Sequence, residues 1–259
     1  MYCPSIDELK KFYKSPLGAL AGRRLRRRIK NIWEDVFESK GKGKNIVLGV
    51  GYAAPYLVPL LKKKNYTPIS YMPSKIGAAQ WPKEKKNLSL MGDKFNMPFD
   101  DSSIDRVLLI HSLEYSDNPS HMMREIWRIL APEGRVLVIV PNRRSMWAKA
   151  EKTPFGHGMP FSYYQLKDLL EESMFLKTKT EFGLYLPPFE TKFLLRTFAG
   201  IVEFLQNVSD KSRILKPRGG GVILMEAKKQ IYATNEYKRK KKEALEPAYN
   251  QNGQGLKKG

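Results

Sequence analysis

One stretch, residues 87–142, constrains the fold of this chain more than any other. Its apolar runs predict three strands, which lie at 88–90, 107–110 and 136–140. A helical pattern at 120–130 precedes the last of them and is followed by Pro132-Glu133-Gly134, which we expect to be a turn. This alternation of strand, helix and glycine turn is typical of half of a doubly wound α/β sheet.

The residues before this stretch supply the other half. Apolar runs predict strands at 45–50 and 67–72, with a helix through Leu57 between them. Upstream we expect a short helix at 7–14 and a second one that begins at Ser15-Pro16, a favourable cap and first position. The second helix is amphipathic, and its polar face carries the arginines of residues 23–28. Such a face can bind phosphates or a membrane. Otherwise it is a solvated face of a helix packed on the sheet edge.

Residues after 142 complete the organisation. Ser162 predicts the start of a helix over 163–174, and strands are expected at 176–186 and 222–227. A helix is also expected after Pro187-Pro188. We therefore predict three parts, which are N-terminal helices packed on the core (1–40), an α/β domain (41–232) and a disordered basic tail (233–259).

Charge and cysteine content narrow the classes of function. The net charge of +20 favours nucleic acid, anionic lipid or an acidic substrate as a partner, although a general bias toward lysine explains it equally well. A single cysteine and three scattered histidines exclude a disulfide framework and a Cys/His zinc cluster, so no metal site is predicted. Residues 1–5 do not resemble a signal peptide, and no apolar run reaches the roughly 20 residues of a membrane span. We expect a soluble cytoplasmic protein.

Motifs in the central stretch carry a family resemblance. An acidic residue, Asp93, precedes Met97-Pro98-Phe99, and Ile104-Asp105-Arg106-Val107 opens a strand that ends at His111. With the helix and glycine turn that follow, residues 45–142 resemble the class I S-adenosylmethionine-dependent methyltransferases, of the type 11 kind. The flanking residues are similar to those of a bacterial branch with a degenerate first-strand motif. The resemblance implies a Rossmann-like, doubly wound sheet of seven strands, mostly parallel with an antiparallel last strand.

The resemblance also implies a set of cofactor-binding residues for S-adenosylmethionine. Asp93 would accept a hydrogen bond from the adenine amino group, and Lys94 would offer a backbone N–H. Gly51 would admit the methionine end, with Tyr52 beside it, and Leu109 and His111 would lie where the fourth strand ends. Residues that complete the set at the ends of the first two strands are Gly49 and Met72. For Asp93 the alternative is a capping residue in a polar turn, and for His111 it is a packed histidine without a role.

Two departures weaken this expectation. In the family's acidic first-strand motif, this chain has Gly49 in place of the acid, and Ala53 and Pro55 in place of the later glycines. The ribose-binding acid after the second strand is replaced by Met72-Pro73-Ser74. A lost charge-assisted hydrogen bond costs about 1.5–3 kcal/mol, so other groups must bind the ribose, or the cofactor binds weakly, or the domain is not catalytic.

A dinucleotide fingerprint, G-x-G-x-x-A, fits Gly49 to Ala54 as well, but it requires an acid about 20 residues later. Only Lys75 lies there, and the central stretch argues against this interpretation. Methyl transfer mainly requires alignment of donor and acceptor, with a base only where the acceptor begins protonated. His157, in a glycine- and aromatic-rich loop, is the tentative catalytic base or lid residue. It is otherwise a loop histidine.

Three functions compete. The first is a methyltransferase acting on a small or lipid-like molecule, with an apolar pocket from residues such as Phe155, Phe161 and Tyr163. The second is an RNA or nucleoprotein methyltransferase, which the arginines of 23–28 and the lysines of 238–242 favour and whose binding would weaken with salt. The third is a non-catalytic binding module, which the missing acids favour. The acceptor, the atom methylated and the oligomeric state are not predicted.

Overall fold

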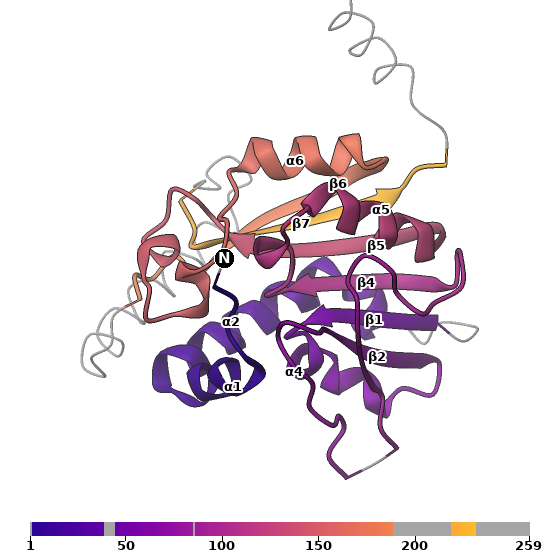
Figure 1. Cartoon of the computed structure of the whole chain (residues 1–259), viewed down its shortest axis with the longest axis horizontal. Coiled ribbons are helices and arrows are strands. Elements are labelled where there is room, and N and C mark those ends of the chain that lie inside the picture. Colours follow the sequence, from indigo (N-terminus) through magenta and orange to yellow (C-terminus); the bar gives the residue numbers. More distant parts are fainter. Residues whose placement is uncertain (1, 39–44, 85, 189–218, 232–259) are drawn as a thin grey trace, which may run out of the picture.

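The computed structural model describes residues 2–38, 45–84, 86–188 and 219–231, and these form a three-layer α/β/α domain (Figure 1). The expected helix after Pro187-Pro188 and the expected basic tail lie outside the described residues. The strands are β1 (Asn45–Gly51), β2 (Tyr66–Pro73), β3 (Ser89–Gly92), β4 (Ile104–Ile110), β5 (Leu130–Pro141), β6 (Phe175–Gly183) and β7 (Val222–Lys229). The α-helices are α1 (Ile6–Lys14), α2 (Pro16–Ile32), α3 (Glu34–Glu38), α4 (Ala54–Leu57), α5 (Pro119–Ile129) and α6 (Tyr163–Glu172).

The strands form one sheet in the order β3-β2-β1-β4-β5-β7-β6. Pairing is parallel from β3 to β5, whereas β7 runs antiparallel to both of its neighbours. The chain order reverses direction across the sheet between β1 and β4, which is where doubly wound folds bind ligands at the carboxyl ends of their strands. The prediction of a mostly parallel, seven-stranded sheet with an antiparallel last strand is confirmed.

One face of the sheet is covered by α5 and α6. Apolar side chains of β1, β4 and β5, such as Val50, Leu109 and Val138, pack there with Ile126 of α5 and Leu170 of α6, all fully buried. The other face is covered by α2, whose Leu25 and Ile29 are buried with residues from β1, β4, β5 and β7. We expected α2 at the edge of the sheet. It lies on the face instead, where its buried residues from Leu17 to Ile32 pack with residues of four strands.

Serine residues cap the starts of three helices, α1, α2 and α6. Ser15 accepts a hydrogen bond from the N–H of Gly18 and Pro16 begins α2, while Ser162 caps α6 in a reciprocal pair with Gln165. Ser5 caps α1 in the same way with Glu8. The first two caps are as predicted.

The expected turn at Pro132-Glu133-Gly134 is instead part of β5. The register changes across it, since Ile104 pairs with Leu130 but Arg106 pairs with Arg135. The extra residues form a bulge in one long strand, in which Glu133 has a φ of 67°. The glycine signal therefore marks a bulge in the strand and not its start.

A charged brace holds the loop that follows β3. Glu125 of α5 accepts a hydrogen bond from the N–H of Met97, at 2.6 Å, and pairs with Arg128 at 2.7 Å. Arg128 donates to the carbonyls of Met97 and Phe99, at 3.0 and 2.9 Å. Asp105 accepts from the N–H of Ile46, at 2.7 Å, and so joins the starts of β4 and β1. These residues fix the amino-terminal edge of β1 and β4 and the loop that leads from β3 into β4.

None of the helices in the described part of the chain has the length and apolarity needed to cross a bilayer.

Candidate active site

The loop after β1 crosses very close to the end of β4. Gly51 has a φ of 83°, and a Cβ on this residue would lie 2.3 Å from the carbonyl oxygen of Ile110. A Cβ at Gly49 would lie 2.5 Å from that of Ala53. Both glycines are therefore required by the packing of the protein itself. The N–H of Tyr52 donates to Ile110, at 2.9 Å, which joins the two strand ends.

Helix α1 lies across this edge of the sheet. In Figure 1 the arrowheads of β1, β2 and β4 point toward the side where α1 and the N-terminus lie. Ile6 and Leu9 pack with Tyr52, Met72 and Ile76, all of them buried. The N–H of Ile6 also donates to the carbonyl of Ile76, at 2.8 Å. Two residues of the predicted cofactor set, Tyr52 and Met72, are thus under α1.

Tyr13 makes the most direct contact between α1 and the site. Its hydroxyl lies 2.8 Å from Nε2 of His111, and its ring stacks on that of Tyr52 with centroids 5.0 Å apart. Burial raises the pKa of Tyr13 well above its ordinary value, so this phenol is protonated at any physiological pH. Because Nδ1 of His111 faces the Glu114 carboxylate, we infer that His111 carries its proton on Nδ1 and that Tyr13 donates to Nε2.

His111 itself is fully buried and has a φ of 52°, which is uncommon for a residue other than glycine. Its Nδ1 lies 3.4 Å from Oε1 of Glu114, and none of the described residues makes a hydrogen bond to it. Glu114 is 1% exposed, and its Oε2 accepts from the N–H of Ser112, at 3.0 Å. The site therefore contains a buried carboxylate and a buried imidazole, followed by the partly buried Tyr13.

The predicted adenine side is more open. Asp93 is exposed and accepts a hydrogen bond from the N–H of Phe95 through Oδ1, at 2.9 Å, as a turn-capping residue does. The ring of Phe95 stacks on His121 with centroids 4.8 Å apart, which adds an aromatic wall. The side chain of Lys94 is buried and donates to the carbonyl of Tyr115, at 3.2 Å. Desolvation lowers the pKa of Lys94, with Asp117 nearby as a partly compensating charge.

The loop that contains His157 is fixed to the residues after β4. Tyr115 donates a hydrogen bond to the carbonyl of Pro154, and the N–H of Met159 donates to that of Glu114, at 2.8 Å. His157 is half-buried and its ring contacts Tyr2 edge-on, with centroids 4.7 Å apart. Phe155 of the same loop does contact His111, and the two ring centroids lie 4.8 Å apart.

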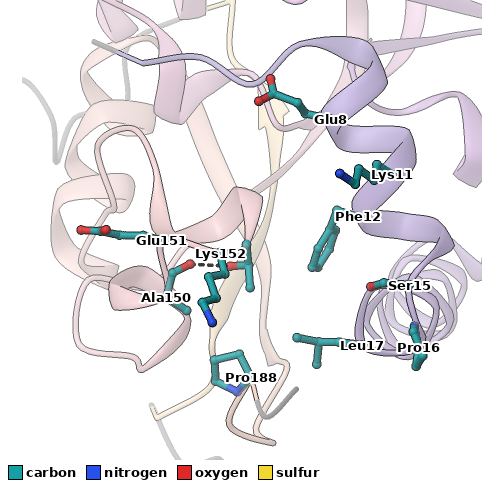
Figure 2. A pocket seen from close by; sticks show the side chains of 11 residues that line it. Glu8, Lys11, Phe12, Ser15, Pro16, Leu17, Ala150, Glu151, Lys152 and Pro188 are labelled. Atoms are coloured by element: carbon teal, nitrogen blue, oxygen red, sulfur yellow. Dashed lines mark hydrogen bonds between the residues drawn. The ribbon is translucent and has the colours of Figure 1, made fainter. Parts of the chain in front are cut away.

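A cavity of about 550 Å³ lies between the N-terminal helices and this loop. Figure 2 shows Phe12 and Leu17 on one side of it and Lys152 and Pro188 on the other. Phe12 also contacts Phe155, with centroids 6.1 Å apart, so a short aromatic layer separates the cavity from His111.

Comparison with known proteins agrees with this architecture. A family model described as a methyltransferase domain matches residues 46–138. Residues 46–138, about a third of the chain, are therefore similar to a methyltransferase domain. The solved structure of a SAM-dependent methyltransferase from Thermotoga maritima, described as a possible histamine N-methyltransferase, superposes with a TM-score of 0.59 at 19% identity. It covers 87% of this chain and 96% of that one, and it shows the shared fold.

Curated relatives of the methyltransferase domain include two plant enzymes. The chloroplastic 2-methyl-6-phytyl-1,4-hydroquinone methyltransferase of Arabidopsis thaliana is 28% identical over 100 residues, which are 38% of this chain and 30% of that protein. A corresponding enzyme of Oryza sativa subsp. japonica is 25% identical over 114 residues, or 44% and 33% of the two chains. This chain spans about a third of the length of these relatives.

The methyltransferase domain thus brings together some of the predicted residues. Gly51, Tyr52 and His111 meet at the ends of β1 and β4, and Met72 joins them through α1. Leu109 lies one residue deeper and packs in the core against α5. Tyr13 and Glu114 were missed by sequence reasoning. The only available signal for Glu114 was its position three residues after His111, and Tyr13 is 98 residues away from its partner.

Proposed function

We propose that this chain is an S-adenosylmethionine-dependent methyltransferase whose acceptor is a small, largely apolar molecule. The observation that carries the proposal is the agreement of two independent features. The methyltransferase family model matches residues 46–138. Those residues build strands β1 to β5, which lie side by side in the sheet in the order β3-β2-β1-β4-β5. S-adenosylmethionine supplies an activated methyl group, and the protein must bind it, align the acceptor and exclude water.

The adenine side of the site has groups suited to this donor. Asp93 is an exposed carboxylate whose contact with Phe95 uses Oδ1, and the stacked rings of Phe95 and His121 offer a flat apolar surface. We assign the adenine amino group to Asp93 and a neighbouring contact to the backbone of Lys94. The methionine end is assigned to the Gly51-Tyr52 turn beside His111.

The ribose side fits less well in the present arrangement. Met72 stands where the family has an acid, and Ile6 and Leu9 of α1 pack over it. The hydrophobic residues that pack with Met72 supply no carboxylate for the ribose hydroxyls. We infer that α1 moves away from the ends of β1 and β2 when the donor enters.

The cavity beside Phe12 is our candidate for the acceptor. Its walls include Phe12, Pro16, Leu17 and Pro188, and Lys11 and Lys152 add positive charge at its margin. A volume of about 550 Å³ is within the range of small-molecule sites. The plant relatives act on a hydroquinone with a phytyl chain, and a lipid-like acceptor of that kind agrees with apolar walls.

Calorimetric titration with S-adenosylmethionine and S-adenosylhomocysteine tests the proposal directly. We expect saturable binding of both. Absence of binding at millimolar ligand would overturn it and would leave a methyltransferase fold that acts as a non-catalytic module.

Replacement of Asp93 tests the adenine assignment. Asp93→Asn keeps an oxygen for the N–H of Phe95 but removes the charged acceptor, so we expect donor affinity to fall about tenfold to hundredfold, equivalent to ~1.5–3 kcal/mol. Asp100→Asn, an exposed position in the next turn, is the matched control and should bind normally. Equal affinities for the two variants would refute the assignment of Asp93.

A further inference from the structure

The buried row of Glu114, His111 and Tyr13 is not explained by donor binding or by packing alone. Glu114 is a carboxylate in the interior, where an ionised group is costly unless it serves a neighbouring cation or donor. His111 lies between it and Tyr13, in the left-handed region, with Nδ1 facing the carboxylate at 3.4 Å and no hydrogen-bond partner among the described residues. Backbone strain and an unsatisfied buried nitrogen at one residue are features of functional sites.

The Tyr13 contact defines what Nε2 of His111 recognises. The phenol oxygen of Tyr13 lies 2.8 Å from Nε2, which is the acceptor when the imidazole proton is on Nδ1 toward Glu114, and the phenol ring lies flat on Tyr52. Phe155 borders the imidazole on another side. The slot that Tyr13 fills is thus aromatic in shape, with Nε2 of His111 at its inner end and the hydroxyl of Tyr56 nearby.

We propose that Glu114 and His111 form a proton-accepting pair for a phenolic acceptor. The side chain of Tyr13 occupies the position of the acceptor's phenol ring until the acceptor binds, and the remainder of the acceptor lies in the neighbouring cavity beside Phe12. This inference rests on the proposed function and deepens it, because it names the acceptor class. His111 is the catalytic residue in this assignment. Glu114 is a positioning residue, which orients the imidazole and stabilises its charged form.

In the proposed reaction the phenolic proton would pass to Nε2 of His111. The phenol oxygen would then form a bond to the methyl group of S-adenosylmethionine, while the methyl–sulfur bond breaks and its electron pair stays on the sulfur. The proton on His111 then leaves to solvent, and Glu114 has no net change. A phenol that is deprotonated as it reacts is a far better nucleophile than a neutral one, which is what a general base contributes.

The first experiment empties the slot and fills it with a probe. Tyr13→Ala is titrated with 4-nitrophenol, whose phenolate absorbs visible light, at a pH where the free probe is predominantly neutral. We expect binding with appearance of the phenolate band. In the double variant Tyr13→Ala/His111→Gln we expect the phenolate band to disappear and 4-nitrophenol to bind at least tenfold more weakly. The Tyr13→Ala variant should bind 4-nitrotoluene, which lacks the hydroxyl, at least tenfold more weakly than 4-nitrophenol. A neutral bound probe, or equal binding of the two probes, would overturn the proposal.

The role of Glu114 needs a readout that loss of packing would not change. The chain has three histidines, His111, His121 and His157, so ¹⁵N resonances of the His111 ring can be assigned by single replacements. In the wild type we expect the proton on Nδ1 and a hydrogen-bonded, unprotonated Nε2. Tyr13→Phe should move the Nε2 resonance alone. Glu114→Gln should move that of Nδ1, and Glu114→Asp should restore it.

A proton on Nε2 in the wild type would refute the proposal without use of any variant. The proposed function fails separately, since it is decided by titration of the wild-type protein with S-adenosylhomocysteine. A protein that binds this ligand but leaves 4-nitrophenol neutral would retain the methyltransferase assignment and lose the phenolic one.

Discussion

At the scale of single residues, the motif that predicted the family is mostly structural. Asp105 joins the starts of two strands through the N–H of Ile46, and Glu125 and Arg128 fix the backbone of Met97 and Phe99. These side chains define the position of the loop that carries Asp93 through contacts within the protein. A motif match therefore predicts this framework well and predicts the binding residues only indirectly.

Glu125→Gln tests this brace. The variant keeps the size of the side chain but loses the charge that pairs with Arg128, so we expect a loss of about 1.5–3 kcal/mol in unfolding free energy, measured in urea. Arg124→Ala, at an exposed position of the same helix, should be nearly neutral. Equal stabilities of both variants would show that the brace contributes nothing.

The same variant has a predictable pH dependence. Burial alone would raise the pKa of Glu125, but hydrogen bonds from Arg128 and from the N–H of Met97 outweigh it and lower the pKa. A lowered pKa in the folded state contributes stability above the unfolded pKa of about 4.3, and this contribution is lost as the pH falls through the folded value. The difference between wild type and Glu125→Gln should thus be largest near neutral pH and shrink in acid.

At the scale of elements, α1 is where prediction from sequence reached its limit. Its helical period and position were predictable, as were the caps at Ser15 and Ser162. That α1 lies over the end of the sheet depends on contacts of Ile6, Leu9 and Tyr13 with residues 39 or more positions away, and no local pattern encodes such contacts. The same reason explains the placement of α2 on the face of the sheet, since amphipathicity specifies an apolar stripe but not its partner.

Movement of α1 can be measured by amide hydrogen exchange. Because Ile6, Leu9 and Tyr13 cover Tyr52, Met72 and His111, saturating S-adenosylhomocysteine should accelerate exchange in residues 6–14. Helix α6 packs on the face of the sheet that α5 also covers, away from α1. Its exchange should be unchanged and serves as the internal control. Full binding with unaltered exchange in α1 would show that the donor enters without displacing this helix.

At the scale of the whole molecule, the N-terminal helices and the sheet share one core. Leu25 of α2 is fully buried with Val47 of β1, Leu137 of β5 and Leu224 of β7, and Arg28 pairs with Glu181 of β6 at 3.1 Å. The sequence predicted helices packed on the core, but the sheet strands they contact became clear only from the structure. We propose that residues 1–38 and the sheet unfold as one cooperative unit.

Leu25→Ala tests that cooperativity. Loss of a fully buried leucine should cost about 2–5 kcal/mol, and a single transition should shift as a whole in both fluorescence and circular dichroism. Leu20→Ala, at a partly buried position of α2, should cost less. Two separate transitions, or a shift confined to one probe, would contradict a shared core.

The antiparallel direction of β7 has a consequence for how such a protein can diversify. Because β7 runs against β6, the chain leaves the sheet at Gly183 and returns at Val222 at the same end, near Pro188 and the cavity beside Phe12. The proposed donor-binding residues come from the ends of β1 to β4, at the other half of that end. We therefore expect that sequence changes near Pro188 alter the proposed acceptor selectivity while the proposed donor residues stay constant, so that the two halves of this end can evolve separately.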